Sequence, residues 1–253
     1  MSAASPPALA ITGATKRFGA VLALDNVDLS VQHGEVLALL GDNGAGKSTL
    51  IKCLSGVHRL DAGTMYMDGR PVDIGSPASA RAHGIETVYQ DLALFDNLNP
   101  AANFYAGREP GGPKWLPRGL RFMRQREMAD ATAAVLSRLQ VGIGDHRANV
   151  GLMSGGQRQA IAVARAAAFA SQVVILDEPT AALGLRESRR VLDLIKRLRE
   201  EGRAVIVISH AMDHVIEIAD RAVVMRRGRK VGEEAPRADN HQRIVSLIVG
   251  GDS

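Results

Sequence analysis

A glycine-rich stretch at residues 41–49 constrains the fold of this 253-residue chain more than any other feature. It reads Gly-Asp-Asn-Gly-Ala-Gly-Lys-Ser-Thr and fits the pattern G-x-x-x-x-G-K-S. The apolar run 36–40 before it predicts a buried strand, and residues 47–56 after it have the spacing of a helix. Strand, glycine-rich turn and helix in this order predict a loop that holds phosphate groups. The alternative is a glycine-rich turn that carries a lysine by chance.

The residue types in this loop suit a nucleoside triphosphate with magnesium. Glycine lets the backbone curl so that successive amide groups face phosphate oxygens, and the following helix adds its positive N-terminal end. Lys47 is expected to reach the β- and γ-phosphates, and the hydroxyl of Ser48 to ligate Mg²⁺. The residues expected to bind ATP here are Gly41, Asp42, Asn43, Gly44, Ala45, Gly46, Lys47, Ser48 and Thr49.

The rest of the chain predicts an α/β fold. Strands are expected at 24–31, 36–40, 173–176 and 204–209, a hairpin at 65–72, and helices at 47–56, 125–139, 157–169 and 187–200. Strands and helices in alternation favour a mostly parallel sheet with helices on both faces, interrupted by a helical insertion over about 92–170. We expect residues 1–8, which are small and proline-rich, to be disordered, and residues 9–250 to form one ATPase domain.

Composition narrows the class of protein. With 46% hydrophobic and 23% charged residues, the chain has enough apolar side chains for a core. Its net charge of +4 comes with no nucleic-acid-binding motif, so we expect no nucleic-acid partner. The single cysteine, Cys53, can form no intrachain disulfide and is expected to pack in the core. No apolar run approaches the roughly 20 residues of a membrane span and no signal peptide is visible, so we expect a soluble, cytosolic chain.

Two carboxylates follow the apolar strand at 173–176. Asp177 and Glu178 would stand at the carboxyl edge of the sheet, where open α/β sheets bind their ligands. Asp177 is expected to hold magnesium and Glu178 to act as general base toward the attacking water. The alternative is an ordinary polar strand end or a helix-capping pair. His210 closes the next apolar strand in the same way, although a lone histidine is more often structural.

A run of small residues leads into the helix expected from Gln157. Ser154, Gly155 and Gly156 at a helix N-terminus predict a second anion site, with the serine hydroxyl as an additional donor. The same residues are typical of a plain helix cap. The residues alone leave both interpretations open.

Taken together, these features resemble the ABC ATPases. The residues that carry the resemblance are the phosphate loop, Gln90, the stretch Met-Ser-Gly-Gly-Gln at 153–157, the pair Asp177-Glu178, and His210. They occur in the family's order and approximate spacing, over about residues 9–250. The resemblance implies a P-loop ATPase core with a mostly parallel sheet, an N-terminal antiparallel β subdomain and an inserted helical subdomain. It also implies catalytic roles for Lys47, Gln90, Glu178 and His210, and a magnesium contact for Gln90.

The resemblance further implies a head-to-tail homodimer. Ser154, Gly155, Gly156 and Gln157 of one copy would complete the ATP site of the other. Phe18 resembles the aromatic residue that stacks on adenine, where many relatives carry tyrosine; a core phenylalanine is the alternative. Gly184 stands where the family usually has the aspartate of a loop that communicates across the dimer.

Within the family, the stretches 76–78, 84–85, 88–92 and 103–109 look like the monosaccharide-importer branch in its single-domain, fructose-type form. This implies transmembrane permease subunits as partners, a periplasmic sugar-binding protein as an indirect one, and a place on the cytoplasmic face of the inner membrane. An exporter, a non-transport ABC ATPase and a regulatory module that ATP only switches are the alternatives. The basic run at 226–230 predicts a solvated hairpin turn.

Overall fold

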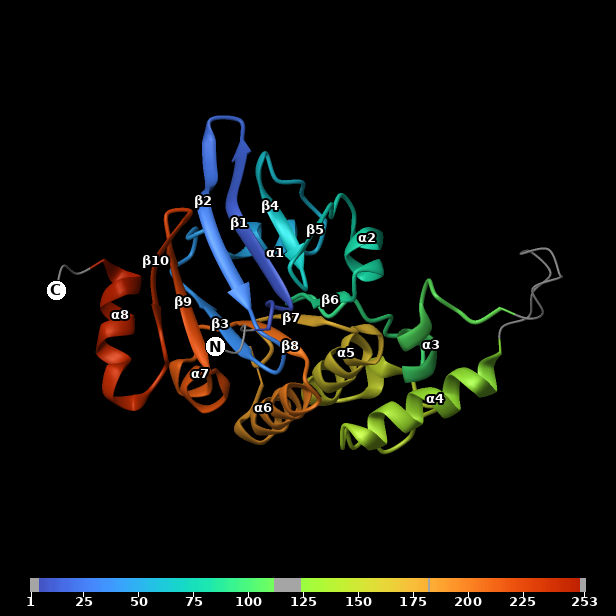
Figure 1. The fold of residues 1–253 in the computed structure, drawn as a ribbon. Coiled ribbons are helices and arrows are strands. Elements are labelled where there is room, and N and C mark those ends of the chain that lie inside the picture. Colours follow the sequence, from blue (N-terminus) through green and yellow to red (C-terminus); the bar gives the residue numbers. More distant parts are fainter. Residues whose placement is uncertain (1–4, 112–123, 182, 251–253) are drawn as a thin grey trace.

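A computed structural model describes residues 5–111, 124–181 and 183–250 of the chain, and it contains two sheets with helices around them (Figure 1). The strands are β1 (Leu9–Phe18), β2 (Val21–Val31), β3 (Val36–Leu40), β4 (Ala62–Met67), β5 (Arg70–Val72), β6 (Ile85–Val88), β7 (Val173–Asp177), β8 (Ala204–Ile208), β9 (Arg221–Arg226) and β10 (Arg229–Glu234). The α-helices are α1 (Lys47–Leu54), α2 (Pro77–Ala82), α3 (Pro100–Tyr105), α4 (Gln125–Arg138), α5 (Gly155–Phe169), α6 (Leu185–Glu200), α7 (Met212–Ile218) and α8 (His241–Val249).

The larger sheet has six strands in the order β10-β9-β3-β8-β7-β6. All neighbours are parallel except the hairpin β9–β10, because helices return the chain to the same edge between the other strands. Strands β3 and β8 are buried along their whole length, which explains their continuous apolar sequences. Their carboxyl ends, with that of β7, meet at one edge of the sheet and position the candidate site.

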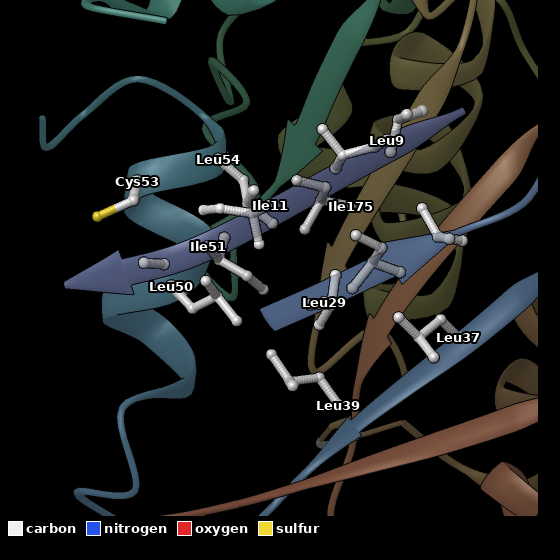
Figure 2. Packing of buried hydrophobic residues seen from close by; sticks show 14 of the residues in the cluster. Leu9, Ile11, Leu29, Leu37, Leu39, Leu50, Ile51, Cys53, Leu54 and Ile175 are labelled. Atoms are coloured by element: carbon white, nitrogen blue, oxygen red, sulfur yellow. The ribbon is translucent and has the colours of Figure 1, made fainter. Parts of the chain in front are cut away.

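The smaller sheet is antiparallel, in the order β2-β1-β4-β5, and lies over the larger one (Figure 1). Helix α1 packs in the core between them. Figure 2 shows Leu50, Ile51 and Leu54 of this helix directed toward Ile11 of the small sheet and Ile175 of the large one, and these side chains are buried. Each contributes about 1.5–3 kcal/mol to folding. This packing fixes the helix that follows the glycine-rich loop, and with it the loop.

Helix α2 lies on the same side as α1, where Ala80 packs in the same core, and the remaining helices cover the opposite face of the parallel sheet or lie beside it. Helices α5, α6 and α7 lie against that face, α8 lies beside β9 and β10, and α3 and α4 pair at the far end (Figure 1). Helix α6 is strongly amphipathic, and its apolar stripe, which includes Val191, Ile195 and Leu198, is buried. In the described part of the chain, no helix is long and apolar enough to cross a membrane.

The expected strands and helices form within a few residues of their expected bounds. Helix α5 begins at Gly155 rather than Gln157 because Ser154 caps it. Cys53 is buried, as expected, and burial raises the pKa of its thiol to about 11. The expectation of disorder over residues 1–8 fails at Ala8, which is fully buried and whose carbonyl accepts a hydrogen bond from the Asp68 amide. Residues 1–4 lie outside the described residues.

Candidate functional site

A cavity of about 810 Å³ opens where the glycine-rich loop meets the carboxyl edge of the parallel sheet. Most of the residues expected at the site line it, from segments far apart in the sequence. They are Asp42, Asn43, Gly44, Ala45, Gly46, Lys47, Ser48 and Thr49 of the loop, with Gln90, Asp177, Glu178 and His210. Val21, Leu22, Ala23, Ala181, Ile208, Arg227 and Gly228 complete the lining. The structure thus brings together in one cavity the groups that phosphate and metal binding require.

Close approach of neighbouring strands explains two glycines of the loop. Gly41 and Gly46 have φ values of 143° and 103°, which side chains rarely allow. A Cβ on Gly41 would lie 2.2 Å from the carbonyl oxygen of Met225 in β9, and one on Gly46 would lie 2.8 Å from that of Ala23 in β2. The loop is therefore wedged between β9 and β2, with its amides directed by this packing.

Lys47 begins helix α1 and is buried. Its ammonium donates hydrogen bonds to the carbonyl oxygens of Gly41 at 2.5 Å and Asp42 at 3.0 Å. Burial lowers the pKa of Lys47, and the nearby carboxylates of Glu178, Asp42 and Asp177 oppose that shift. The ammonium of Lys47 is thus bound by backbone carbonyls of the loop. From there it can exchange these hydrogen bonds for ones to phosphate oxygens.

The two carboxylates at the end of β7 carry a desolvation cost. Burial raises the pKa of Asp177, and the charge of Lys47 is the largest influence opposing it. Burial also raises the pKa of Glu178, opposed first by His210. Glu178 adopts a left-handed φ of 52°, and its amide donates to the Ile208 carbonyl at 3.0 Å, which holds this conformation. Strained backbone of this kind clusters at functional sites.

His210 and Glu178 lie next to each other in the lining of the cavity. The Nε2 atom of His210 lies 3.1 Å from Oε1 of Glu178. The contact lacks the geometry of a hydrogen bond, since Oε1, which is buried, has no hydrogen-bond partner among the described residues. Oε1 therefore remains an available acceptor, as a general base needs.

The lining residues fit a magnesium ion better than a metal held by protein alone. Ser48, Gln90 and Asp177 bring a hydroxyl, an amide and a single carboxylate to the same cavity. Within the described ranges, no group of three or more His, Cys, Asp or Glu residues is placed to hold a metal. Magnesium commonly binds one or two protein oxygens together with phosphates and water, so this sparse donor set suits it.

The stretch Ser154–Gln157 lies elsewhere. Ser154 Oγ accepts from the Gln157 amide at 3.2 Å, and Gln157 Oε1 accepts from the Ser154 amide at 3.0 Å, which forms a capping box. Ser154 and Gly155 are exposed, and in the described part of the chain neither they nor Gly156 and Gln157 line the cavity. The helix-cap interpretation is correct as local structure, and the stretch remains open to a second molecule.

Phe18 also lies outside the cavity lining. Its side chain is 43% exposed, which rules out the alternative of a core phenylalanine. The ring packs edge-on against His58, with 5.1 Å between the centroids. Phe18 pairs with Val21 in the β1–β2 hairpin, and Val21 does line the cavity, so the ring flanks the site.

Sequence reasoning missed two features around these motifs. The turn between β9 and β10 was expected as a solvated hairpin, and it does form, but Arg227 and Gly228 line the cavity. Glu187 of α6 packs against the stretch Ser154–Gln157, called the signature stretch below: a Cβ on Gly156 would lie 2.2 Å from Glu187 Cγ. Both contacts are long-range, and only the basic run at 226–230 offered a signal in the sequence.

A phosphate loop, a carboxylate pair and a histidine at the carboxyl edge of a parallel sheet define a P-loop nucleotide hydrolase. The family model "ABC transporter" matches residues 24–181, so the chain belongs to the ABC transporter family. It is 46% identical to the fructose import ATP-binding protein FrcA of Rhizobium meliloti over 248 residues, which cover 98% of this chain and 95% of the relative. It is 42% identical to the xylose/arabinose import ATP-binding protein XylG of Sulfolobus acidocaldarius, covering 95% of this chain and 93% of that protein.

Longer relatives and solved structures agree with this assignment. The ribose import ATP-binding protein RbsA 1 of Rubrobacter xylanophilus is 44% identical over 96% of this chain, which spans only 47% of that relative. A nucleotide-free ATP-binding cassette from an ABC transporter superposes with a TM-score of 0.82 at 25% identity, covering 96% of this chain and 97% of the cassette. A dimeric bacterial ABC transporter cassette superposes with a TM-score of 0.73 at 23% identity, which shows the shared fold.

Proposed function

We propose that this chain is the ATP-binding and ATP-hydrolysing subunit of an ABC importer that powers uptake of a monosaccharide of the fructose, ribose or xylose type. The observation that carries the proposal is the single cavity in which Lys47, Gln90, Asp177, Glu178 and His210 face the phosphate loop. The sugar class rests on the relatives that match nearly the whole chain, which are fructose, xylose/arabinose and ribose import ATP-binding proteins. Nothing in the cavity itself reads the sugar.

The residues of the cavity divide the work of hydrolysis. The amides of the loop and the ammonium of Lys47 bind and orient the phosphates. Glu178, held with a free acceptor, takes a proton from the attacking water, and its burial-raised pKa makes it a better base than an exposed carboxylate. His210 orients the water or the γ-phosphate opposite Glu178. Ser48, Gln90 and Asp177 would hold Mg²⁺, which when bound neutralises charge on the phosphates.

We further propose that two copies act together. The stretch Ser154–Gln157 forms a helix N-terminus at which Ser154 and Gly155 are exposed, which suits the phosphates of ATP held by the other copy. The chain carries one phosphate loop and one signature stretch, whereas the ribose relative is about twice as long. Phe18, which flanks the cavity, would stack on adenine after rotation away from His58.

The remaining partners follow from the import function. Transmembrane permease subunits would dock near Gln90 and place the chain on the cytoplasmic face of the inner membrane. A periplasmic sugar-binding protein would act only through that permease. Residues 9–250 would form one domain, with the helical insertion at about 92–170 as the part that approaches the permease. No nucleic acid takes part.

The decisive experiment compares ATP turnover by the wild type and by Glu178→Gln. We expect turnover to fall by about 10²–10⁴-fold because the general base is lost, while ATP binding is retained. At high ATP the variant should dimerise, as light scattering would show. Equal turnover in both proteins would refute the role of Glu178, and a monomer at saturating ATP in the presence of the permease would refute the dimer. ATP binding by the wild type without turnover, with the permease present, would favour the regulatory module.

A further inference from the structure

The turn between β9 and β10 is fastened to the phosphate loop. The amide of Gly228 donates to the carbonyl oxygen of Ala45 at 2.9 Å, and the carbonyl of Gly228 accepts from the Asp25 amide at 2.8 Å. The Cα of Gly228 lies 3.3 Å from the point that a Cβ on Gly46 would occupy. The backbone of the turn is therefore fixed against the loop, and Arg227 is held beside the cavity.

Arg227 occupies a backbone position that its residue type disfavours. It has a φ of 48°, followed by 80° at Gly228. The hairpin between β4 and β5 has nearly the same turn, with 48° at Asp68 and 74° at Gly69. Asp-Gly and Asn-Gly are the favoured pairs for such turns, because short polar side chains tolerate positive φ. The chain thus uses the favoured pair in one hairpin and Arg-Gly in the hairpin that faces the phosphate loop.

The two basic residues that follow Gly228 have partners. Arg229 pairs with Asp25 through Nε at 2.7 Å, and the ammonium of Lys230 pairs with Glu233 at 2.5 Å. Arg227 is exposed and makes no ion pair with any residue that the structure describes. With Lys47, it is one of the two lysine or arginine residues among the described residues that line the cavity.

We infer that Arg227 is a nucleotide-binding residue that supplies the phosphate site with a second cation beside Lys47. An aspartate at this position would suit the turn better but would place a negative charge in a cavity built for polyphosphate. The positive charge of arginine in the cavity therefore explains why this residue type occupies a position whose φ favours aspartate or asparagine. The inference rests on the proposed ATP-binding function and adds to it a contact made by the β9–β10 hairpin.

The test separates the charge of Arg227 from its backbone. Arg227→Lys keeps the charge, whereas Arg227→Asn and Arg227→Asp remove or reverse it and improve the turn. Lys230→Gln is the control, since that residue belongs to the same hairpin and pairs away from the cavity with Glu233. Calorimetry would measure the binding of ATP, ADP and adenosine at low and high salt, and thermal melting would measure stability without nucleotide.

We expect Arg227→Asn to weaken ATP binding about fivefold at low salt and Arg227→Asp to weaken it more, with smaller differences at high salt. Adenosine binding by each variant should match that of the wild type, and so should ATP binding by Arg227→Lys and Lys230→Gln. The melting temperatures of the Asn and Asp variants should equal or exceed that of the wild type. Unchanged ATP affinity in Arg227→Asp would overturn the inference, as would equal losses for ATP and adenosine. If the wild type itself binds no ATP, the proposed function fails instead.

Discussion

The cavity at the phosphate loop and the signature stretch Ser154–Gln157 treat their polar groups in opposite ways. In the cavity, burial lowers the pKa of Lys47 and raises the pKa values of Asp177 and Glu178, so each charge there is held at a cost. In the signature stretch, Ser154 and Gln157 satisfy each other in a capping box and remain accessible to solvent. The charged groups of the cavity are disfavoured by burial, whereas the polar groups of the signature stretch are satisfied within their own chain.

This difference explains why two motifs of one family need not meet in one copy. Groups under electrostatic strain, such as Lys47 and Asp177, gain from a ligand that brings phosphate and metal into the same cavity. A satisfied, exposed helix N-terminus gains only from an anion carried by another molecule. The comparison therefore predicts large effects of substitutions on binding at the cavity, and effects at the signature that depend on a second copy.

The largest effect is expected from Lys47→Met. ATP affinity should fall by about 100-fold, because hydrogen bonds from a charged group contribute up to ~3 kcal/mol. Stability without nucleotide should stay the same or rise, since a buried ammonium is replaced by an apolar side chain. Calorimetry and thermal melting measure the two quantities. Lys52→Met, on the exposed side of the same helix, is the control and should retain affinity. Wild-type ATP affinity in Lys47→Met would contradict the assignment of this cavity as the ATP site.

A mixing experiment tests whether the two regions act across copies. Lys47→Met and Ser154→Arg should each have little ATPase activity alone. In a head-to-tail dimer, the mixed pair restores one intact site, so an equimolar mixture should recover about a quarter of wild-type activity. Each variant mixed with itself at the same total concentration gives the baseline. No recovery, despite mixed dimers detected by mass, would mean that both regions serve the same copy's ATP.

The parts of this comparison that the sequence predicted are those encoded locally. The loop at Gly41–Thr49, the carboxylates at the end of β7 and the cap at Ser154 follow from short patterns of residue type, and each forms where expected. The positions of Arg227 and Glu187 could not be predicted in this way. Arg227 is placed by the packing of the β9–β10 turn against segments more than a hundred residues away in the sequence, and Glu187 by the packing of α6 against α5. Ala8 was missed because a single buried alanine leaves no pattern.

A smaller effect is expected from Gly156→Ala, which tests how closely the signature helix packs on α6. The new Cβ would lie 2.2 Å from Cγ and 2.5 Å from Cβ of Glu187, neither of which is the free end of a side chain. Alanine gains about 1 kcal/mol in helix propensity, but overpacking costs about 1–3 kcal/mol, so we expect a net loss of stability.

Chemical denaturation of Gly156→Ala, Glu187→Ala and the double variant would measure that coupling. The double variant should recover part of the loss, because removal of Cγ relieves the closer of the two contacts. Additive effects would show that Glu187 moves aside without cost. Gly155→Ala is the matched control, since the nearest atom to its Cβ lies 3.7 Å away, at Leu183.

The smallest effect concerns the cost of holding Glu178 charged in the cavity. Because burial raises its pKa above the unfolded value, Glu178 favours folding at low pH and loses that contribution as pH rises through its folded pKa. Glu178→Gln should therefore be more stable than the wild type at neutral pH, by about 1 kcal/mol or roughly 2–4 °C in Tm, since a neutral amide is cheaper to bury. The advantage should shrink on acidification toward the ordinary glutamate pKa of about 4.3.

Glu217 provides a control of opposite sign for this pH dependence. Lys196 and Arg189, each at 2.7 Å, lower the pKa of Glu217, so Glu217→Gln should reduce stability at neutral pH and the loss should vanish in acid. Melting both variants without nucleotide from pH 4 to pH 8 would compare a carboxylate placed for chemistry with one placed for structure. A neutral-pH loss of stability in Glu178→Gln would show that the contact with His210 outweighs burial, and the cavity would then resemble the signature stretch in satisfying its own groups.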